Sequence, residues 1–172
     1  LSSICTDHVT NMANTFYYCR SLKELDVRHF KTSNVTDFTG MFSSCTGLTA
    51  LDVTGFDTSN ATSMTTMFRN CSSLRTLDVS GFNNSKNTSF GDTFSGCESL
   101  EELDVSGFDT RSAKYFNGTF QKCRKLKKLD VSGFDMSVAV NTSDMFNYCS
   151  SVTELDVSGF RTSSLEDMSY MF

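Results

Sequence analysis

The sequence predicts a solenoid: a stack of similar 26-residue coils, each with one short parallel β-strand. The first observation is the even spacing of six cysteines, each 26 residues after the last. The second is a pair of phenylalanine columns with the same spacing, which together hold 13 of the 16 phenylalanines. The third is the stretch LDVSGF, which occurs four times after the variants LDVRHF and LDVTGF. Sequence periods of about 20–50 residues are typical of stacked-repeat proteins.

The strand is expected at L-D-V, because no other segment of the unit looks like a strand. A propeller blade needs four strands and about 40 residues, which disfavours that alternative. Side chains alternate along a strand, so Leu77 and Val79 are expected inside and Asp78 outside. The same reasoning gives a solvent-facing column that is a possible partner surface: Asp26, Asp52, Asp78, Asp104, Asp130 and Asp156. We expect about six and a half right-handed coils, with an irregular or short-helical convex side.

The cysteine column is expected to be buried and structural, and it consists of Cys19, Cys45, Cys71, Cys97, Cys123 and Cys149. A buried free cysteine behaves as a small apolar residue. Stacked cysteines with Cα atoms about 5 Å apart also satisfy disulfide geometry, so vertical disulfides remain an alternative. A glycine column after the strand is expected to adopt positive φ in a turn: Gly55, Gly81, Gly107, Gly133 and Gly159.

The repeated pattern F-x-x-C-x-x-L-x-x-L-x-V resembles the Treponema-type leucine-rich repeat. The stretch LDVTGFDTSNATSMTTMFRNC at 51–71 is similar to the longer repeat of the BspA-like surface proteins. This resemblance implies a leucine-rich-repeat-like solenoid with a parallel sheet on one face. It also implies an extracellular or cell-surface location, a role in adhesion and no enzymatic activity. We expect a single repeat domain over 1–172 that is part of a longer array, with less regular copies near 83–93 and 135–145.

Several classes of function are not expected. The net charge of −5 gives no basic face for nucleic acid. No apolar run approaches the roughly 20 residues of a membrane span. No nucleophile elbow or phosphate-binding glycine loop is present, so we expect no catalytic residue and no cofactor. Calcium needs about 6–8 oxygen ligands, and one aspartate per coil supplies few, so no metal site is expected either.

The sequence contains seven N-x-S/T patterns, which are candidate N-glycosylation sites: Asn34, Asn60, Asn70, Asn83, Asn87, Asn117 and Asn141. Six lie in columns expected to face solvent, whereas Asn87 lies in a column of small apolar residues. In an organism with a glycosylating secretory pathway, several are expected to carry glycans; otherwise they are polar surface residues.

Two kinds of function remain open. The first is recognition of an extracellular protein or glycan ligand, because solenoids present extended surfaces. Its specificity would come from positions that vary beside the strand: Lys23, Glu24, Arg75, Glu101, Glu102, Lys127, Lys128 and Glu154. The second is a structural filament or surface layer built from head-to-tail copies. It is suggested by Leu1 and Phe172, which fall in core columns and leave neither end with a polar cap.

Overall fold

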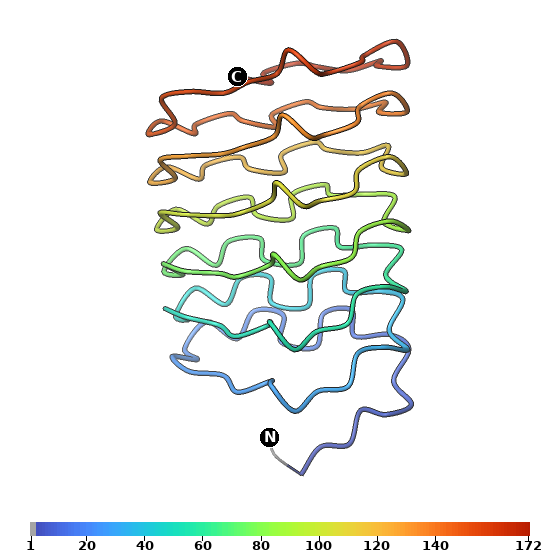
Figure 1. The fold of residues 1–172 in the computed structure, drawn as a ribbon. Coiled ribbons are helices and arrows are strands. Elements are labelled where there is room, and N and C mark those ends of the chain that lie inside the picture. Colours follow the sequence, from blue (N-terminus) through green and yellow to red (C-terminus); the bar gives the residue numbers. More distant parts are fainter. Residues whose placement is uncertain (1–2) are drawn as a thin grey trace.

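The structure is a computed structural model that describes residues 3–172, which wind into a stack of coils (Figure 1). Within these residues no α-helix and no β-strand is assigned; the chain consists of turns, irregular segments and isolated parallel β-bridges. The bridges pair Asn11 with Asp37, Asp37 with Ser63, Ala50 with Thr76, Ser89 with Tyr115, Tyr115 with Asn141, and Asn141 with Asp167. Each bridge joins residues 26 positions apart, so the stacking step equals the sequence period.

Backbone hydrogen bonds between coils gather on one side of the stack, which we call the ladder face. It consists of residues 10–18, 36–44, 62–70, 88–96, 114–122, 140–148 and 166–171. In the first of these segments, Met12 donates to the carbonyl of Asp37 at 2.9 Å and Phe16 donates to Met41 at 2.8 Å. Bonds of this kind recur at every second residue. The ladder face therefore binds each coil to the next through main-chain atoms.

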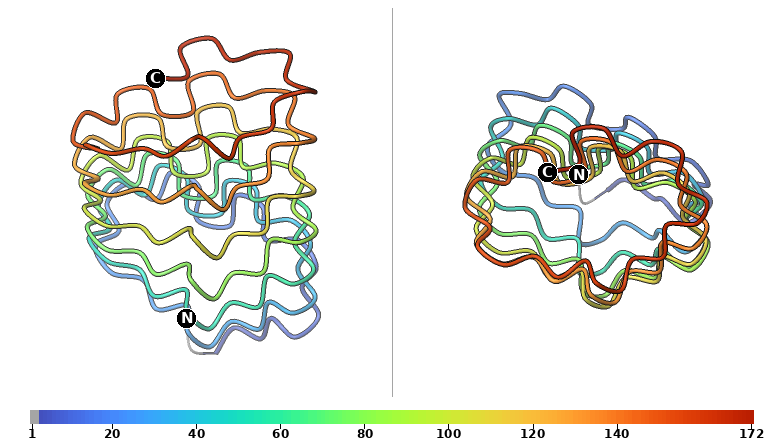
Figure 2. Two further views of the ribbon diagram at one scale, coloured as in Figure 1. Left: turned by 45° about the horizontal axis from the view of Figure 1, so that its top comes forward. Right: turned by 90° about the horizontal axis from the view of Figure 1, so that it is seen from above.

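The ladder face consists of successive tight turns, visible as square meanders in Figure 2. Within one segment, Tyr17 donates to the carbonyl of Asn14 at 3.0 Å and Cys19 donates to Phe16 at 3.2 Å. Two positions in each coil have positive φ. They are Asn14, Gly40, Thr66, Asp92, Gly118, Asp144 and Tyr170, and then Tyr18, Ser44, Asn70, Gly96, Lys122 and Tyr148. Most are not glycine, and such residues cost about 1–2 kcal/mol each in this region. The bonds to neighbouring coils offset that cost.

The opposite side of the ring, seen from above in Figure 2, is the L-D-V face. It consists of residues 25–27, 51–53, 77–79, 103–105, 129–131 and 155–157. The structure differs here from the expected sheet, because no backbone hydrogen bond joins these segments to one another in the described residues. The nearest links lie just before them, such as the bond from Arg75 N–H to Thr49 at 3.1 Å. Of the irregular or short-helical conformations expected for the rest of the coil, residues 3–172 adopt the irregular one.

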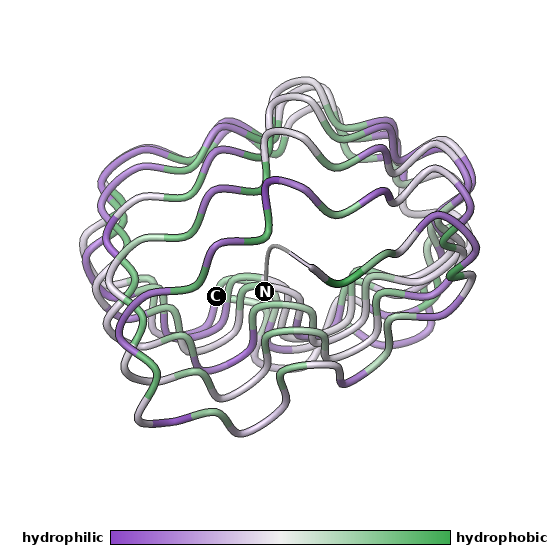
Figure 3. Cartoon of the chain, turned by 90° about the horizontal axis from the view of Figure 1, so that it is seen from below, coloured by the Kyte–Doolittle hydropathy of each residue, from purple (hydrophilic) through white to green (hydrophobic). Residues whose placement is uncertain are grey.

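The interior is filled by side chains that repeat from coil to coil. Figure 3 shows hydrophobic residues recurring at equivalent places in successive coils. Phe42 and Phe68 stack with ring centroids 5.6 Å apart, and Phe68 and Phe94 follow at 5.7 Å. Val53 and Val79 are each only 1% exposed. Each coil buries its apolar side chains against the coils on both sides, which is how a repeat too small to form its own core becomes stable.

The expectation of positive φ for the glycines after L-D-V is wrong. Among the described residues the positive-φ glycines are Gly40, Gly96 and Gly118, all on the ladder face. A close approach between neighbouring coils instead explains why some of these positions after L-D-V hold glycine. A Cβ atom at Gly159 would lie 3.2 Å from the carbonyl oxygen of Ser132, whereas one at Gly81 would meet nothing within 4 Å.

Candidate recognition surface

Each aspartate of the L-D-V face closes a small local turn. Oδ1 of Asp78 accepts hydrogen bonds from the hydroxyl of Ser80 at 2.7 Å and from its backbone N–H at 3.0 Å. The same pair of bonds recurs at Asp52, Asp104 and Asp130. Both bonds go to Oδ1 of each of these four aspartates. Their Oδ2 atoms form no hydrogen bond in the described part of the chain.

These hydrogen bonds keep the aspartates ionised. The hydroxyl and N–H of Ser80 lower the pKa of Asp78, and equivalent residues lower the pKa of Asp104 and Asp130. Asp26 differs, because the guanidinium of Arg28 binds both of its carboxylate oxygens at 3.0 Å and holds its pKa far below the usual range. The L-D-V face is therefore a row of carboxylates, of which the first is neutralised by its own arginine.

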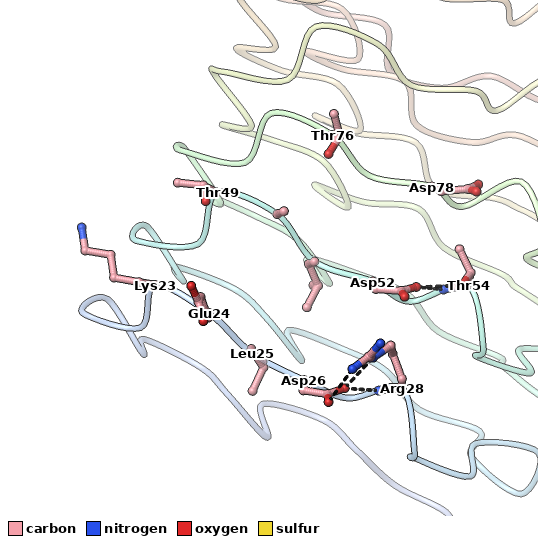
Figure 4. A pocket seen from close by; sticks show the side chains of 12 residues that line it. Lys23, Glu24, Leu25, Asp26, Arg28, Thr49, Asp52, Thr54, Thr76 and Asp78 are labelled. Carbon is pink, nitrogen blue, oxygen red and sulfur yellow. Dashed lines mark hydrogen bonds and ion pairs between the residues drawn. The ribbon is translucent and has the colours of Figure 1, made fainter. Parts of the chain in front are cut away.

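A hollow of about 650 Å³ opens on this face across the first three L-D-V segments (Figure 4). Its charged lining comes from Lys23, Glu24, Asp26, Arg28, Asp52 and Asp78. Between the charges lie the small side chains of Thr49, Ala50 and Thr76. Leu25 and Leu51 also line it, so the hollow offers both signs of charge, hydroxyl groups and some apolar surface.

A second hollow of about 430 Å³ lies on the same face, between the fourth and fifth L-D-V segments. It is lined by Glu101, Glu102, Leu103, Asp104, Lys127, Lys128 and Asp130. Lys127 Nζ lies 3.1 Å from Glu101 Oε2, and this contact lowers the pKa of Glu101. Both hollows thus include the positions that vary from coil to coil beside the repeated aspartate.

A family model described as "Mycoplasma protein of unknown function, DUF285" matches residues 1–103 and again residues 75–172. The chain belongs to the DUF285 family. Together the two matches span the whole DUF285 chain. At a coarse level, the assignment is consistent with the resemblance to BspA-like repeat surface proteins. Neither a curated protein nor a solved structure matches the chain.

Two further findings concern the described part of the DUF285 chain. Nowhere in residues 3–172 do three or more His, Cys, Asp or Glu side chains gather in a way that would hold a metal ion. The same residues include no apolar helix with the length that a bilayer crossing requires.

The cysteine column of the DUF285 chain lies inside the stack except at its ends. Cys45, Cys71, Cys97 and Cys123 are buried, Cys149 is half-buried and Cys19 is exposed. All are free thiols, and so is the exposed Cys5. Each of the five from Cys45 onward points its Sγ at the carbonyl oxygen of a phenylalanine in the preceding coil. The expected alternative of vertical disulfides is therefore not adopted.

The candidate glycosylation sites fall into three groups. Asn34, Asn70 and Asn83 are exposed; Asn60, Asn117 and Asn141 are half-buried; Asn87 is completely buried. Nδ2 of Asn34 donates to the carbonyl of Asp7, and Nδ2 of Asn60 donates to that of Ser33, both at 2.8 Å. A glycan on either nitrogen would leave it a single N–H for that bond between coils. Asn70 and Asn83 are exposed and form no such bond, which makes them the most accessible acceptors.

Sequence reasoning missed a column of buried threonines. Thr58 accepts a hydrogen bond from the N–H of Asn83 at 2.8 Å and donates one to its carbonyl at 3.1 Å. Thr32 and Thr110 bind Asp57 and Asp135 in the same way. The signal in the sequence was the recurrence of threonine two residues after the second phenylalanine of the unit. Its function is to join coils at a position away from the ladder face.

Proposed function

We propose that this chain is a leucine-rich-repeat-like solenoid of the BspA type that recognises an extracellular or cell-surface protein or glycan through its L-D-V face. The observation that carries the proposal is the location of the two lateral hollows, which both open on this face. We do not propose that the chain catalyses a chemical reaction of the ligand. The chain would bind and hold its partner.

The side chains around the hollows support this function. The aspartate and the small hydroxyl residue two positions later are nearly constant, and they hold the turn. The two positions just before the leucine vary: Lys23 and Glu24, then Thr49 and Ala50, then Arg75 and Thr76, then Glu101 and Glu102, then Lys127 and Lys128. A constant scaffold with variable exposed positions is the arrangement that repeat proteins use to select large partners.

The proposal is tested with the purified chain on an array of secreted proteins and receptor ectodomains and, in parallel, on a glycan array. We expect binding to members of one array. It should fall at least tenfold in the variant Lys23→Ala/Glu24→Ala/Arg75→Ala, whose substitutions leave the aspartate turns intact. The matched control is Arg69→Ala/Lys114→Ala, which removes exposed charges from the ladder face. Binding that is lost in the control and kept in the first variant would refute the proposal, as would no binding to either array.

A second candidate function is a structural subunit assembled end to end. Most ladder bonds run in one direction, with N–H groups donating toward the following coil, while one N–H at the start of each segment, such as that of Thr36, donates to the preceding coil. The last described coil therefore presents N–H groups at Met168 and Tyr170, and the first presents carbonyl groups at Ala13 and Thr15. The ends also expose apolar side chains, with Phe172 66% exposed and Ile4 47% exposed. Another coil of the same pattern, from this chain or from another copy, would satisfy either end.

Electron microscopy and light scattering of the purified chain distinguish the two candidates. Regular filaments that grow with protein concentration favour the structural subunit. A monomer at all concentrations that binds a partner on the arrays favours recognition.

A further inference from the structure

Two buried asparagines in the turn 84–87 have unpaired polar atoms. Asn84 is 1% exposed and Asn87 is 0% exposed. Nδ2 and Oδ1 of Asn84 and Nδ2 of Asn87 have no hydrogen-bond partner among the described residues. Oδ1 of Asn87 has only a long contact, 3.5 Å from the N–H of Ser89. Buried amide groups without partners are strongly destabilising, so native proteins almost always satisfy them, either with protein atoms or with water.

The backbone around these asparagines is in the same register as in the neighbouring coils. Asn87 N–H donates to the carbonyl of Asn84 at 2.9 Å, as Ala61 does to Thr58 and Ala113 does to Thr110. Only the side chains differ, because Asn84 stands where the two neighbouring coils have threonine and Asn87 where they have alanine. The unpaired atoms therefore arise from two substitutions within an otherwise regular stack.

The threonine that Asn84 replaces would have joined two coils. Thr58 and Thr110 each bind the N–H and carbonyl of the residue 25 positions later. The residue 25 positions after Asn84 is Asp109, and its N–H and carbonyl form no hydrogen bond within the described residues. Five polar groups from Asn84, Asn87 and Asp109 are thus left without partners in one region of the interface between two coils.

A water molecule has the chemistry to satisfy this arrangement. The polar atoms of asparagine are attached to Cγ, one bond further from the backbone than Oγ1 of threonine, so they do not take the place of that hydroxyl. A group in that place must accept from the N–H of Asp109 and donate to its carbonyl. Water can do both and still bind an amide, and internal waters typically form about three hydrogen bonds to otherwise unsatisfied groups.

We propose that Asn84, Asn87 and Asp109 form an internal water-binding site, in which at least one water molecule joins the two coils where threonine joins them elsewhere. The site lies in a column where Asn87 has the small side chains of Ala61 and Ala113 on its two sides. At this interface, solvent would mediate a contact that Thr58 and Thr110 make directly in the neighbouring coils.

A high-resolution crystal structure and water-to-amide nuclear Overhauser spectra of the same chain test the proposal. We expect solvent density within hydrogen-bond distance of Asn84 and the Asp109 backbone, and a cross-peak between a long-lived water and the Asp109 N–H. Direct hydrogen bonds from the amides to each other or to Asp109, with no water between them, would overturn it.

The variant Asn84→Thr/Asn87→Ala restores the residues of the neighbouring coils. We expect it to lose the Asp109 cross-peak, because the new hydroxyl binds Asp109 directly, and to melt several degrees higher. Lys114→Ala is the matched control, since Lys114 is exposed beside Ala113 in the following coil and its side chain forms no hydrogen bond within the described residues; it should leave both readouts unchanged. A cross-peak that persists in the double variant would place the water elsewhere and refute the assignment.

Discussion

The thiol of Cys71 donates a hydrogen bond to the carbonyl oxygen of Phe42 in the preceding coil, across 3.2 Å. Cys97 bonds to Phe68 at the same distance. The cysteine column thus does two things: it fills the core, and it links each coil to the one before it. Because each sulfur is directed at a carbonyl group, the column is stable as free thiols.

Alkaline pH is expected to destabilise the fold through these thiols. Burial raises the pKa of Cys45 and Cys149 to about 11, and it raises the pKa of Cys71 and Cys97 well above 9.0, their ordinary value. The stabilising effect is complete below the unfolded pKa and is lost as pH rises through the folded values. The free energy of unfolding in urea should therefore fall between about pH 9 and pH 11. The variant Cys71→Ala/Cys97→Ala should show a shallower fall; equal slopes would contradict the prediction.

Acid is expected to act through the aspartates of the L-D-V face. Hydrogen bonds from Ser80 and Ser106 lower the pKa of Asp78 and Asp104 below 3.8. Their contribution is present above the unfolded pKa and is lost as pH falls through the lower folded values. Unfolding experiments below pH 4 should show this loss, and Asp78→Asn should reduce its slope. Thr153→Val, at an exposed residue that carries no titratable group, serves as the control and should keep the wild-type slope.

Removing one buried hydroxyl should weaken the contact between two coils. Thr58→Val keeps the shape of the side chain but leaves the N–H and carbonyl of Asn83 without their partner. We expect a loss of about 1–3 kcal/mol in the free energy of unfolding. Thr153→Val removes an exposed hydroxyl with no hydrogen bond and should change stability by less than about 0.5 kcal/mol. Equal effects of the two substitutions in chemical denaturation would show that the threonine column is not stabilising.

Two glycines are expected to respond oppositely to alanine. Gly96 has a φ of +74°, and a Cβ atom there would collide with Oδ1 of Asn70. Gly96→Ala should therefore destabilise the protein by at least about 1–2 kcal/mol. At Gly81, where a Cβ would meet nothing within 4 Å, Gly81→Ala should be neutral or stabilising by up to about 1 kcal/mol. Thermal unfolding of the two variants measures both effects, and a loss at Gly81 as large as that at Gly96 would contradict the geometry.

The repeat period predicts which residues lie over one another, because identical side chains at a fixed interval favour a stack with one coil per interval. The bridge between Asp37 and Ser63 has that interval. What the period does not predict is where the main-chain bonds lie. The alternation of leucine, aspartate and valine indicates which side chains are buried, and burial does not require neighbouring backbones to pair. Most main-chain bonds between coils therefore lie opposite the expected strand, and only a few, with the Ala50–Thr76 bridge, lie beside it.

The ladder face was hidden from sequence reasoning for a second reason. Its positive-φ positions are held by unlike residues such as Thr66, Asp92 and Tyr148, so no glycine column marks them. Surrounding hydrogen bonds impose the conformation there, and the local sequence does not. At the candidate site, the variable charges were predicted from the sequence, but the hollows depend on the spacing of the coils and required the structure.

The one-sided placement of the ladder has a mechanical consequence. Bending the stack so that its L-D-V side widens stretches only the few main-chain bonds just before the L-D-V segments, such as that from Arg75 to Thr49, whereas bending it the other way pulls on the many bonds of residues 36–44 and their equivalents. We therefore expect the molecule to bend more easily in the first direction than in the second. A partner much larger than a single coil would meet a surface whose curvature adjusts to its own.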